Sequence, residues 1–192
     1  RPKLRAYASQ IQFGWGVDTF NPAAALSQPE QYAEAALKAV EQGYTAVKGN
    51  FLRFDENGKI RTHLDTTSHL SREALRTAEK RLAAVRDAVG PDVDILIENH
   101  AMTDVNTAIQ FAKVAEPYDI MYLEEGCTPL NAACMKKIAD RTSIPLTTGE
   151  RTYTRWGFLP FFENGSLGMI QPDIGNCGGI TEAKKIADMA HI

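Results

Sequence analysis

Three glutamates with regular spacing are the residues of this sequence best suited to chemistry. Glu98, Glu124 and Glu150 each follow a short hydrophobic run, and 26 residues separate each glutamate from the next. The runs span residues 93–97, 120–123 and 144–149. The segments between them have the hydrophobic spacing of helices, so each unit is typical of a strand, a carboxylate and a helix.

Parallel strands joined by right-handed crossovers all point in the same direction, so the three strand ends are expected to meet at one edge of a sheet. Carboxylates that lie close together repel one another unless a cation lies between them. A set of oxygen ligands suits Mg²⁺ best. The spacing therefore predicts a magnesium site formed by Glu98, Glu124 and Glu150.

Other side chains that can bind ligands or transfer protons follow the same kind of expected strand. They are Lys48, Asn50, His100, Glu125, Arg151 and Asp173. A single glutamate after a strand is usually a solvated residue or a helix cap. Three at one spacing favour a functional site, because barrels of parallel strands carry their functional groups at these strand ends.

Six strand–helix units are expected along the chain. The expected strands span residues 4–8, 44–48, 93–97, 120–123, 144–149 and 167–171. The expected helices span residues 31–42, 71–89, 103–117, 129–141, 154–164 and 181–191, with Ser71 as the cap of the second. The segment 14–29, with glycine and proline, and the polar segment 53–69 are expected to be loops.

These units predict an α/β protein, either a doubly wound sheet or part of a (β/α)8 TIM-type barrel. A complete barrel has about 250 residues, so six units are three-quarters of one. The favoured architecture is a single, incomplete barrel domain over residues 1–192, with the last units beyond the end of the chain.

Composition limits the classes of function. The chain has 192 residues, 44% of them hydrophobic and 23% charged, and a net charge of −3. This balance offers no basic surface for nucleic acid, and no apolar run reaches the roughly 20 residues of a membrane span. Cys127, Cys134 and Cys177 lack the CxxC spacing of a zinc site and are expected to be reduced thiols. We therefore expect a cytoplasmic protein that contacts neither nucleic acid nor membrane.

Several short motifs resemble one known family. They are Ala46-Val47-Lys48, Tyr122-Leu123-Glu124-Glu125, Thr148-Gly149-Glu150-Arg151, Ile170-Gln171-Pro172-Asp173 and Gly178-Gly179-Ile180-Thr181. Together they resemble the enolase superfamily, mandelate racemase subgroup, and the run 148–156 resembles the galactonate-type acid-sugar dehydratases in particular. The resemblance covers nearly the whole chain, as barrel units one to six. It implies that an N-terminal capping domain and the last barrel units are absent from this chain.

The resemblance implies metal ligands and a general acid. The three metal ligands of the family fall on Glu98, Glu124 and Glu150, and Glu98 stands where family members usually have Asp. The general acid of the galactonate and mannonate dehydratases falls on His100. A second departure is Gly126, which stands where the family has Pro after its two glutamates.

The resemblance also implies groups that contact the substrate or move its proton. Lys48 matches the first lysine of the family's Lys-x-Lys pair, and Asn50 occupies the position of the second, where it can bind substrate but cannot abstract a proton. Arg151 is expected to bind substrate. Asp173 matches the aspartate that, in the dehydratases, pairs with a histidine base on the seventh strand, here expected beyond residue 192.

The function implied is a Mg²⁺-dependent dehydratase that removes water from a sugar acid through an enediolate and releases a 2-keto-3-deoxy acid. A proton α to a carboxylate is too weakly acidic for a side-chain base unless the enediolate is stabilised, which Mg²⁺ and Lys48 would do. His100 would then protonate the departing β-hydroxyl. The expected partner is a small-molecule sugar acid, and a homo-oligomer is expected. The sequence specifies neither the sugar acid nor the number of subunits.

Four alternatives stay open. A racemase, epimerase or cycloisomerase on the same scaffold is disfavoured by Asn50, which cannot act as its base. A non-catalytic barrel that binds metal or an acid sugar is kept open by Glu98 and Gly126. A nucleotide-binding sheet is poorly supported, because the glycines near residue 178 do not follow the GxGxxG spacing. A Schiff base at Lys48, as in an aldolase, would leave the three carboxylates unexplained.

Overall fold

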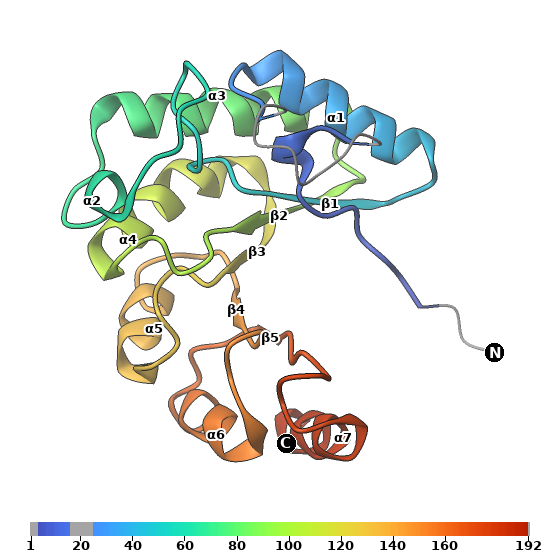
Figure 1. Ribbon diagram of the computed structural model, residues 1–192, viewed down its shortest axis with the longest axis vertical. Helices are drawn as coiled ribbons and strands as arrows, with labels where there is room; N and C mark the ends of the chain where they lie inside the picture. Colours follow the sequence, from blue (N-terminus) through green and yellow to red (C-terminus); the bar gives the residue numbers. More distant parts are fainter. Residues whose placement is uncertain (1–3, 16–24, 192) are drawn as a thin grey trace.

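The computed structural model describes residues 4–15 and 25–191, and its centre is a sheet of five parallel strands. The strands are β1 (Ala46–Gly49), β2 (Asp94–Glu98), β3 (Ile120–Glu124), β4 (Leu146–Thr148) and β5 (Met169–Ile170). They lie side by side in sequence order, each hydrogen-bonded to the next (Figure 1). A doubly wound sheet reverses its strand order part of the way across. The order in the described residues therefore excludes that alternative.

Helices precede β1 and follow every strand, and they cover one face of the sheet. They are α1 (Pro29–Glu41), α2 (His63–Thr66), α3 (Arg72–Val89), α4 (Val105–Ala115), α5 (Ala132–Ala139), α6 (Thr154–Asn164) and α7 (Ile180–Ala190), with 3-10 turns at Ile11–Phe13 and Glu116–Tyr118. Figure 1 shows the longer helices in an arc from α1 and α3 through α4 and α5 to α6 and α7. This α/β arrangement is consistent with a TIM-type barrel domain, and the count of barrel units stays a prediction. None of the helices in residues 4–15 and 25–191 has the length and apolar character of a membrane span.

Local sequence explains where the helices begin and end. The Ser71 hydroxyl accepts a hydrogen bond from the backbone N–H of Ala74 at 3.0 Å, and the Asp104 carboxylate accepts one from Thr107 at 2.9 Å. Gly90 follows the last residue of α3 with a left-handed φ of 75°, which glycine adopts without strain. The cap predicted for α3 is confirmed, and α6 has the bounds predicted from the sequence.

The two faces of the sheet bury different side chains, because successive residues of a strand point to opposite faces. Residues on the helix-facing side belong to the large core between sheet and helices, among them Val47, Ile97, Leu123 and Leu146. The other face, here called the inner face, carries a small separate cluster of buried side chains, Ala46, Leu96 and Tyr122. Polar and charged side chains that follow this cluster along β1, β2 and β3 are therefore positioned by the strands themselves.

The expected first strand, residues 4–8, is not a strand of the sheet. It forms one isolated parallel bridge, in which the Ala8 N–H donates to the Ala46 carbonyl at 2.9 Å. Residues 4–7 are exposed, so their alternating pattern is not matched by a buried face. The described residues thus contain five strands instead of six. Residues 16–24 of the expected loop 14–29 lie outside the described residues.

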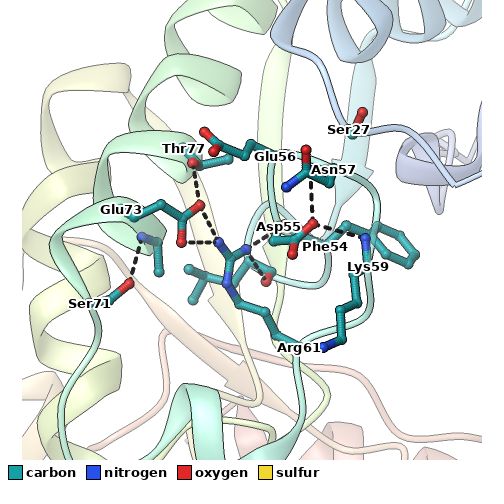
Figure 2. A network of polar contacts seen from close by, with 12 residues as sticks. Ser27, Phe54, Asp55, Glu56, Asn57, Lys59, Arg61, Ser71, Glu73 and Thr77 are labelled. Atoms are coloured by element: carbon teal, nitrogen blue, oxygen red, sulfur yellow. Dashed lines mark hydrogen bonds and ion pairs between the residues drawn. The ribbon is translucent and has the colours of Figure 1, made fainter.

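Two buried arginines attach the polar segment after β1 to α3. Arg61 donates to both carboxylate oxygens of Glu73, at 2.6 and 2.7 Å (Figure 2). Arg81 has no exposed surface, and its guanidinium donates to the carbonyls of Ser27, Phe51, Phe54 and Asp55. These backbone carbonyls have no partner in a strand, so they would otherwise need water. The guanidinium groups donate to them instead. The predicted loop 53–69 is therefore an ordered excursion, which also contains α2 and an antiparallel bridge between Phe54 and Ile60.

Candidate active site

Lys48, Glu98 and Glu124 form a buried cluster of charges at the carboxyl ends of β1, β2 and β3. Each lies two residues beyond a member of the inner-face cluster, and residues i and i+2 of a strand share a face. Lys48 Nζ lies 3.1 Å from Glu98 Oε2 and 2.6 Å from Glu124 Oε2. The three residues are only 7%, 4% and 2% exposed, in chain order. Glu98 and Glu124 are register partners on neighbouring strands. The structure thus brings these two glutamates together, as their spacing predicted.

Burial and crowding of charge change the pKa values in this cluster. Burial and the neighbouring Glu98 raise the pKa of Glu124 to about 7, against the opposite effect of Lys48. Burial alone would lower the pKa of Lys48, but the carboxylates of Glu124 and Glu98 raise it above its ordinary value. Lys48 therefore keeps its proton, and the two carboxylates favour a cation beside them.

A cavity of about 200 Å³ opens beside the cluster. Four residues singled out in the sequence line it: Lys48, Glu98, His100 and Glu150. Its other lining residues, Ser9, Gln10, Gln12 and Gly49, were missed by the sequence analysis. The first three belong to a segment without strand or helix periodicity, where the only signal was the run of polar side chains around Ile11. The cavity therefore receives polar groups from the strand ends and from the N-terminal segment.

Glu150 lines the same cavity but has its own cationic partner. Arg151 Nη2 lies 3.1 Å from Glu150 Oε1, and the Glu150 side chain is 39% exposed. Within the described residues, no three His, Cys, Asp or Glu side chains lie close enough together to hold one metal ion. The donor chemistry nevertheless fits Mg²⁺, because Glu98 and Glu150 line the cavity, Glu124 lies buried beside Glu98, and all three carry hard oxygen ligands. Of the three predicted ligands, Glu98 and Glu124 thus lie together, and Glu150 lies in the lining of the cavity.

His100 lies against the first predicted ligand. Its backbone N–H donates to Glu98 Oε1 at 2.8 Å, and its ring Nδ1 lies 4.0 Å from the same oxygen. Burial lowers the pKa of the ring, and the charge of Glu150 has the opposite effect. The neutral ring is therefore favoured near neutral pH, and nearby negative charge is needed for the ring to carry a proton.

The turns after β2 and β3 have unusual backbone conformations. His100 and Ala101 have φ values of 50° and 53°, and Glu125 has a φ of 46°. Residues other than glycine seldom adopt this left-handed region, and when they do they are concentrated at functional sites. The Ala101 N–H donates to the Glu125 carbonyl at 3.0 Å, so each turn supports the other. This bond helps to fix where His100 enters the cavity.

Arg151 connects the ends of three strands. Its Nη1 lies 2.9 Å from Glu125 Oε2 and donates to the His100 carbonyl at 3.1 Å, while Nη2 contacts Glu150. Glu125 has no exposed surface, and burial raises its pKa to about 8 although Arg151 acts in the opposite direction. Arg151 therefore contacts the carboxyl groups of two residues and supports the His100 turn. Its predicted contact with a substrate stays a prediction.

Asn50 and Asp173, two further predicted site residues, are not part of the cavity lining. Asn50 is 2% exposed, and its Oδ1 accepts a hydrogen bond from the Leu52 N–H at 3.1 Å. Asp173 Oδ1 accepts one from the Asn176 N–H at 2.8 Å, and Asn176 Nδ2 donates to the Glu150 carbonyl at 3.1 Å. Both residues have local structural roles here. Their predicted roles toward substrate stay predictions.

Known proteins are similar to this chain in sequence and in structure. A D-gluconate dehydratase from Thermoproteus tenax is 38% identical over 162 residues, which cover 84% of this chain and 30% of that protein. A D-galactonate dehydratase from Variovorax paradoxus (strain S110) is 38% identical over 120 residues, which cover 62% of this chain and 31% of that protein. The crystal structure of a member of the enolase superfamily from Salmonella Typhimurium matches with a TM-score of 0.94 and 54% identity, and covers 100% of this chain and 48% of that one. The chain thus spans about a third of the two dehydratases and about half of the solved structure.

A family model gives the same assignment. The model described as "Enolase C-terminal domain-like" matches residues 31–192. This range contains the whole five-stranded sheet and the three regularly spaced glutamates. The resemblance carried by the short motifs is therefore confirmed. The chain belongs to the enolase C-terminal domain-like family.

Proposed function

We propose that the protein is an acid-sugar dehydratase, a hydro-lyase that removes water from an aldonate to give a 2-keto-3-deoxy acid. One observation carries this proposal. Lys48 lies between the buried carboxylates of Glu98 and Glu124, beside a cavity that also receives His100 and Glu150. The relatives named D-gluconate dehydratase and D-galactonate dehydratase support a sugar acid as the substrate class.

Glu98, Glu124 and Glu150 would hold Mg²⁺ beside the cavity that Glu98 and Glu150 line. When bound, the ion would supply positive charge that makes a proton α to a carboxylate acidic enough to remove. The crowding of Glu98 against Glu124 supports this assignment, because it favours a cation beside the pair. Glu98 is longer than the usual Asp of the family, and the hydrogen bond from the His100 N–H holds its extra length in place.

Lys48 would bind the substrate carboxylate and would not act as a base. Its raised pKa keeps the ammonium protonated. The ammonium lines the cavity, so negative charge that develops on a substrate carboxylate there would be stabilised by a group already in position.

His100 would donate a proton to the departing β-hydroxyl. Two contacts hold its backbone, because Glu98 accepts from its N–H and Arg151 donates to its carbonyl. A neutral imidazole is a poor proton donor toward a leaving hydroxyl. Glu150, whose charge raises the pKa of the ring, would favour the protonated form that the step requires.

The base that removes the α-proton is not assigned to a residue of this chain. The amide of Asn50 is not basic enough for that step. Asp173 would orient the base, in accordance with the family pattern that it matches, and its turn lies next to the backbone of Glu150 through Asn176.

The test of this function uses the full-length protein, Mg²⁺ and a panel of aldonates, with chemical detection of 2-keto products. His100→Asn is expected to lower kcat for dehydration by roughly 10²–10⁴, the usual contribution of a general acid. Mg²⁺ affinity, measured by calorimetry, is expected to stay unchanged, because His100 supplies no metal ligand. Exchange of the α-proton with solvent deuterium, followed by NMR, should persist because the base is untouched.

His69→Asn is the matched control, since His69 pairs with Gln110 at 2.8 Å and does not line the cavity. It should dehydrate at the parent rate. Dehydration by His100→Asn at the parent rate would show that the acid is another group. If the parent protein exchanges or epimerises aldonates without forming 2-keto products, the racemase-type alternative replaces the dehydratase.

A further inference from the structure

Gln171 directly follows β5 and is held close to the end of β4. Its N–H donates to the Thr148 carbonyl at 3.1 Å, which extends the ladder of the sheet one residue past β5. A Cβ at Gly149 would lie 2.3 Å from both the carbonyl carbon and the carbonyl oxygen of Gln171. Only glycine permits this approach of two backbones. The starting point of the Gln171 side chain is therefore tightly determined.

One orientation of the Gln171 amide satisfies all its neighbours. With Nε2 toward Glu124, the amide donates to Oε2 at 3.0 Å and to Oε1 at 3.3 Å. The amide oxygen then accepts from the hydroxyls of Tyr122 at 3.2 Å and Tyr7 at 3.1 Å. In the opposite orientation the amide oxygen would face the oxygens of Glu124, and an ionised carboxylate has no proton to donate to it. We therefore assign the first orientation on hydrogen-bonding grounds.

The two tyrosines give the amide a firm support. Tyr122 is 2% exposed and lies on β3 two residues before Glu124, so both side chains share the inner face. Tyr7 precedes Ala8, whose backbone is bonded to β1, and Lys48 Nζ lies 5.1 Å from the centre of the Tyr7 ring. The carboxylate of Glu124 decides the orientation of the amide, and both hydroxyls can then donate to the amide oxygen.

We infer that Gln171 is a positioning residue that holds the Glu124 carboxylate for binding of a divalent cation, and that Tyr122 and Tyr7 hold Gln171 in turn. This inference rests on the proposed metal-binding role of Glu124. Lys48 reaches Glu124 Oε2 from β1 at 2.6 Å, and Gln171 reaches both oxygens from the opposite side of β3, after β5. Gln171 carries no charge, so it orients the carboxylate without competing with the cation.

The experiment measures binding of Mn²⁺ alone to the full-length protein by electron paramagnetic resonance. Gln171→Met preserves the length of the side chain and removes its hydrogen-bond donors. The Kd for Mn²⁺ is expected to rise roughly 10–100-fold, as is usual when a group that orients a metal ligand is removed. Gln42→Met is the matched control, because Gln42 lies just after α1 and contacts Trp15 outside the cavity. It should bind Mn²⁺ as the parent protein does.

Glu124→Gln separates this inference from the function on which it rests. If Glu124→Gln binds Mn²⁺ like the parent, the proposed metal role fails, and the inference fails with it. If Glu124→Gln loses binding while Gln171→Met keeps the parent affinity, only the inference is overturned. A purely structural role for Gln171 would lower the Tm of the metal-free protein and leave the Kd of the folded protein unchanged.

Tyr122→Phe is a second test of the positioning role of Gln171, for the case that Gln171→Met does not fold. It removes one of the two hydroxyls that donate to the Gln171 amide oxygen and leaves the amide in place. The Kd for Mn²⁺ is expected to rise, by less than in Gln171→Met. An unchanged Kd in a folded Tyr122→Phe protein would overturn the inference.

Discussion

Gly126 stands where the family pattern has a proline after the two glutamates. Two hydrogen bonds hold the backbone at this position. Its carbonyl accepts from the Thr103 hydroxyl at 2.6 Å, and that hydroxyl accepts from Asn99 Nδ2 at 3.1 Å. The backbone of Gly126 is not in the left-handed region, and a Cβ there would have ordinary contacts of 3.5 Å or more. The turn after Glu125 is thus held by polar contacts, and glycine is not required by its geometry.

Gly126→Ala is therefore expected to stabilise the protein by about 0.4–1 kcal/mol, because alanine restricts the unfolded chain more than glycine does. Urea unfolding of the full-length protein would measure this. Gly149→Ala is the opposite case, since its Cβ would lie 2.3 Å from the Gln171 backbone, and it should destabilise. Equal free energies of unfolding for the two variants would contradict the claim that a Cβ has room at residue 126 and clashes at residue 149.

At the scale of elements, α3 carries the segment that follows β1. Arg81 lies on the buried side of α3 and bonds to four carbonyls of other segments. Arg61 reaches the same helix through Glu73 (Figure 2). These bonds fix the chain between Lys48 and α3 against that helix.

Arg81→Met is expected to lower the free energy of unfolding by roughly 3 kcal/mol or more, because several buried carbonyls would lose their donors. Chemical denaturation would measure the loss. Lys80→Met, on the exposed side of the same helix, is the control and should change stability by at most about 0.5 kcal/mol. A loss for Arg81→Met as small as that of the control would mean that water can replace the guanidinium.

Glu116 joins the turn after α4 to the segment before β4. Its Oε1 accepts from the Ser143 N–H at 2.8 Å and from the Thr142 hydroxyl at 3.0 Å. The bond from Ser143 and the contact with Lys113 are the main reasons that its pKa is lowered to about 2. A lowered pKa in the folded state means that the carboxylate stabilises the fold at neutral pH. That contribution is lost as the pH falls from about 4.5 toward about 2.

Glu116→Gln is consequently expected to be less stable than the parent protein at neutral pH, and the difference should shrink as the pH falls through that range. Urea unfolding of both proteins at a series of pH values would test this. A difference that stays constant across the series would contradict the assigned pKa shift.

At the scale of the whole molecule, the candidate site is shared by segments far apart in the sequence. Its cavity is lined from β1, from the ends of β2 and β4, and from the N-terminal segment around Ile11. A ligand held by several strand ends stabilises the folded protein, because the unfolded chain cannot assemble the site. The proposed metal should therefore act on global stability as well as on chemistry.

Mg²⁺ at 100 times its Kd is expected to stabilise the full-length protein by about 2.7 kcal/mol. Thermal unfolding with and without Mg²⁺ would measure the effect. Glu150→Gln should lose most of it if Glu150 leaves Arg151 to bind the ion. Glu163→Gln, exposed on α6, should keep it. Full stabilisation of Glu150→Gln by Mg²⁺ would remove Glu150 from the ligand set.

Local pattern was enough to predict much of the fold and part of the site. Hydrophobic runs and helix caps located α3 and α6, and parallel strands in sequence order follow from repeated strand–helix units. Glu98 and Glu124 could be placed together because each ends a strand of the same type and direction. Strand periodicity then determines that Lys48 faces the same side.

Tertiary structure decided what periodicity does not encode. The segment 4–8 alternates like a strand, yet within the described residues its backbone is bonded to the sheet only at Ala8, and residues 4–7 are exposed. The contact of Gln171 with Glu124 and that of Arg151 with Glu125 join residues from different strands. Such contacts depend on register and on the turns after the strands, which no local sequence pattern specifies. The sequence by itself thus determined which residue types reach the carboxyl edge of the sheet, and the packing of distant segments decided which of them touch.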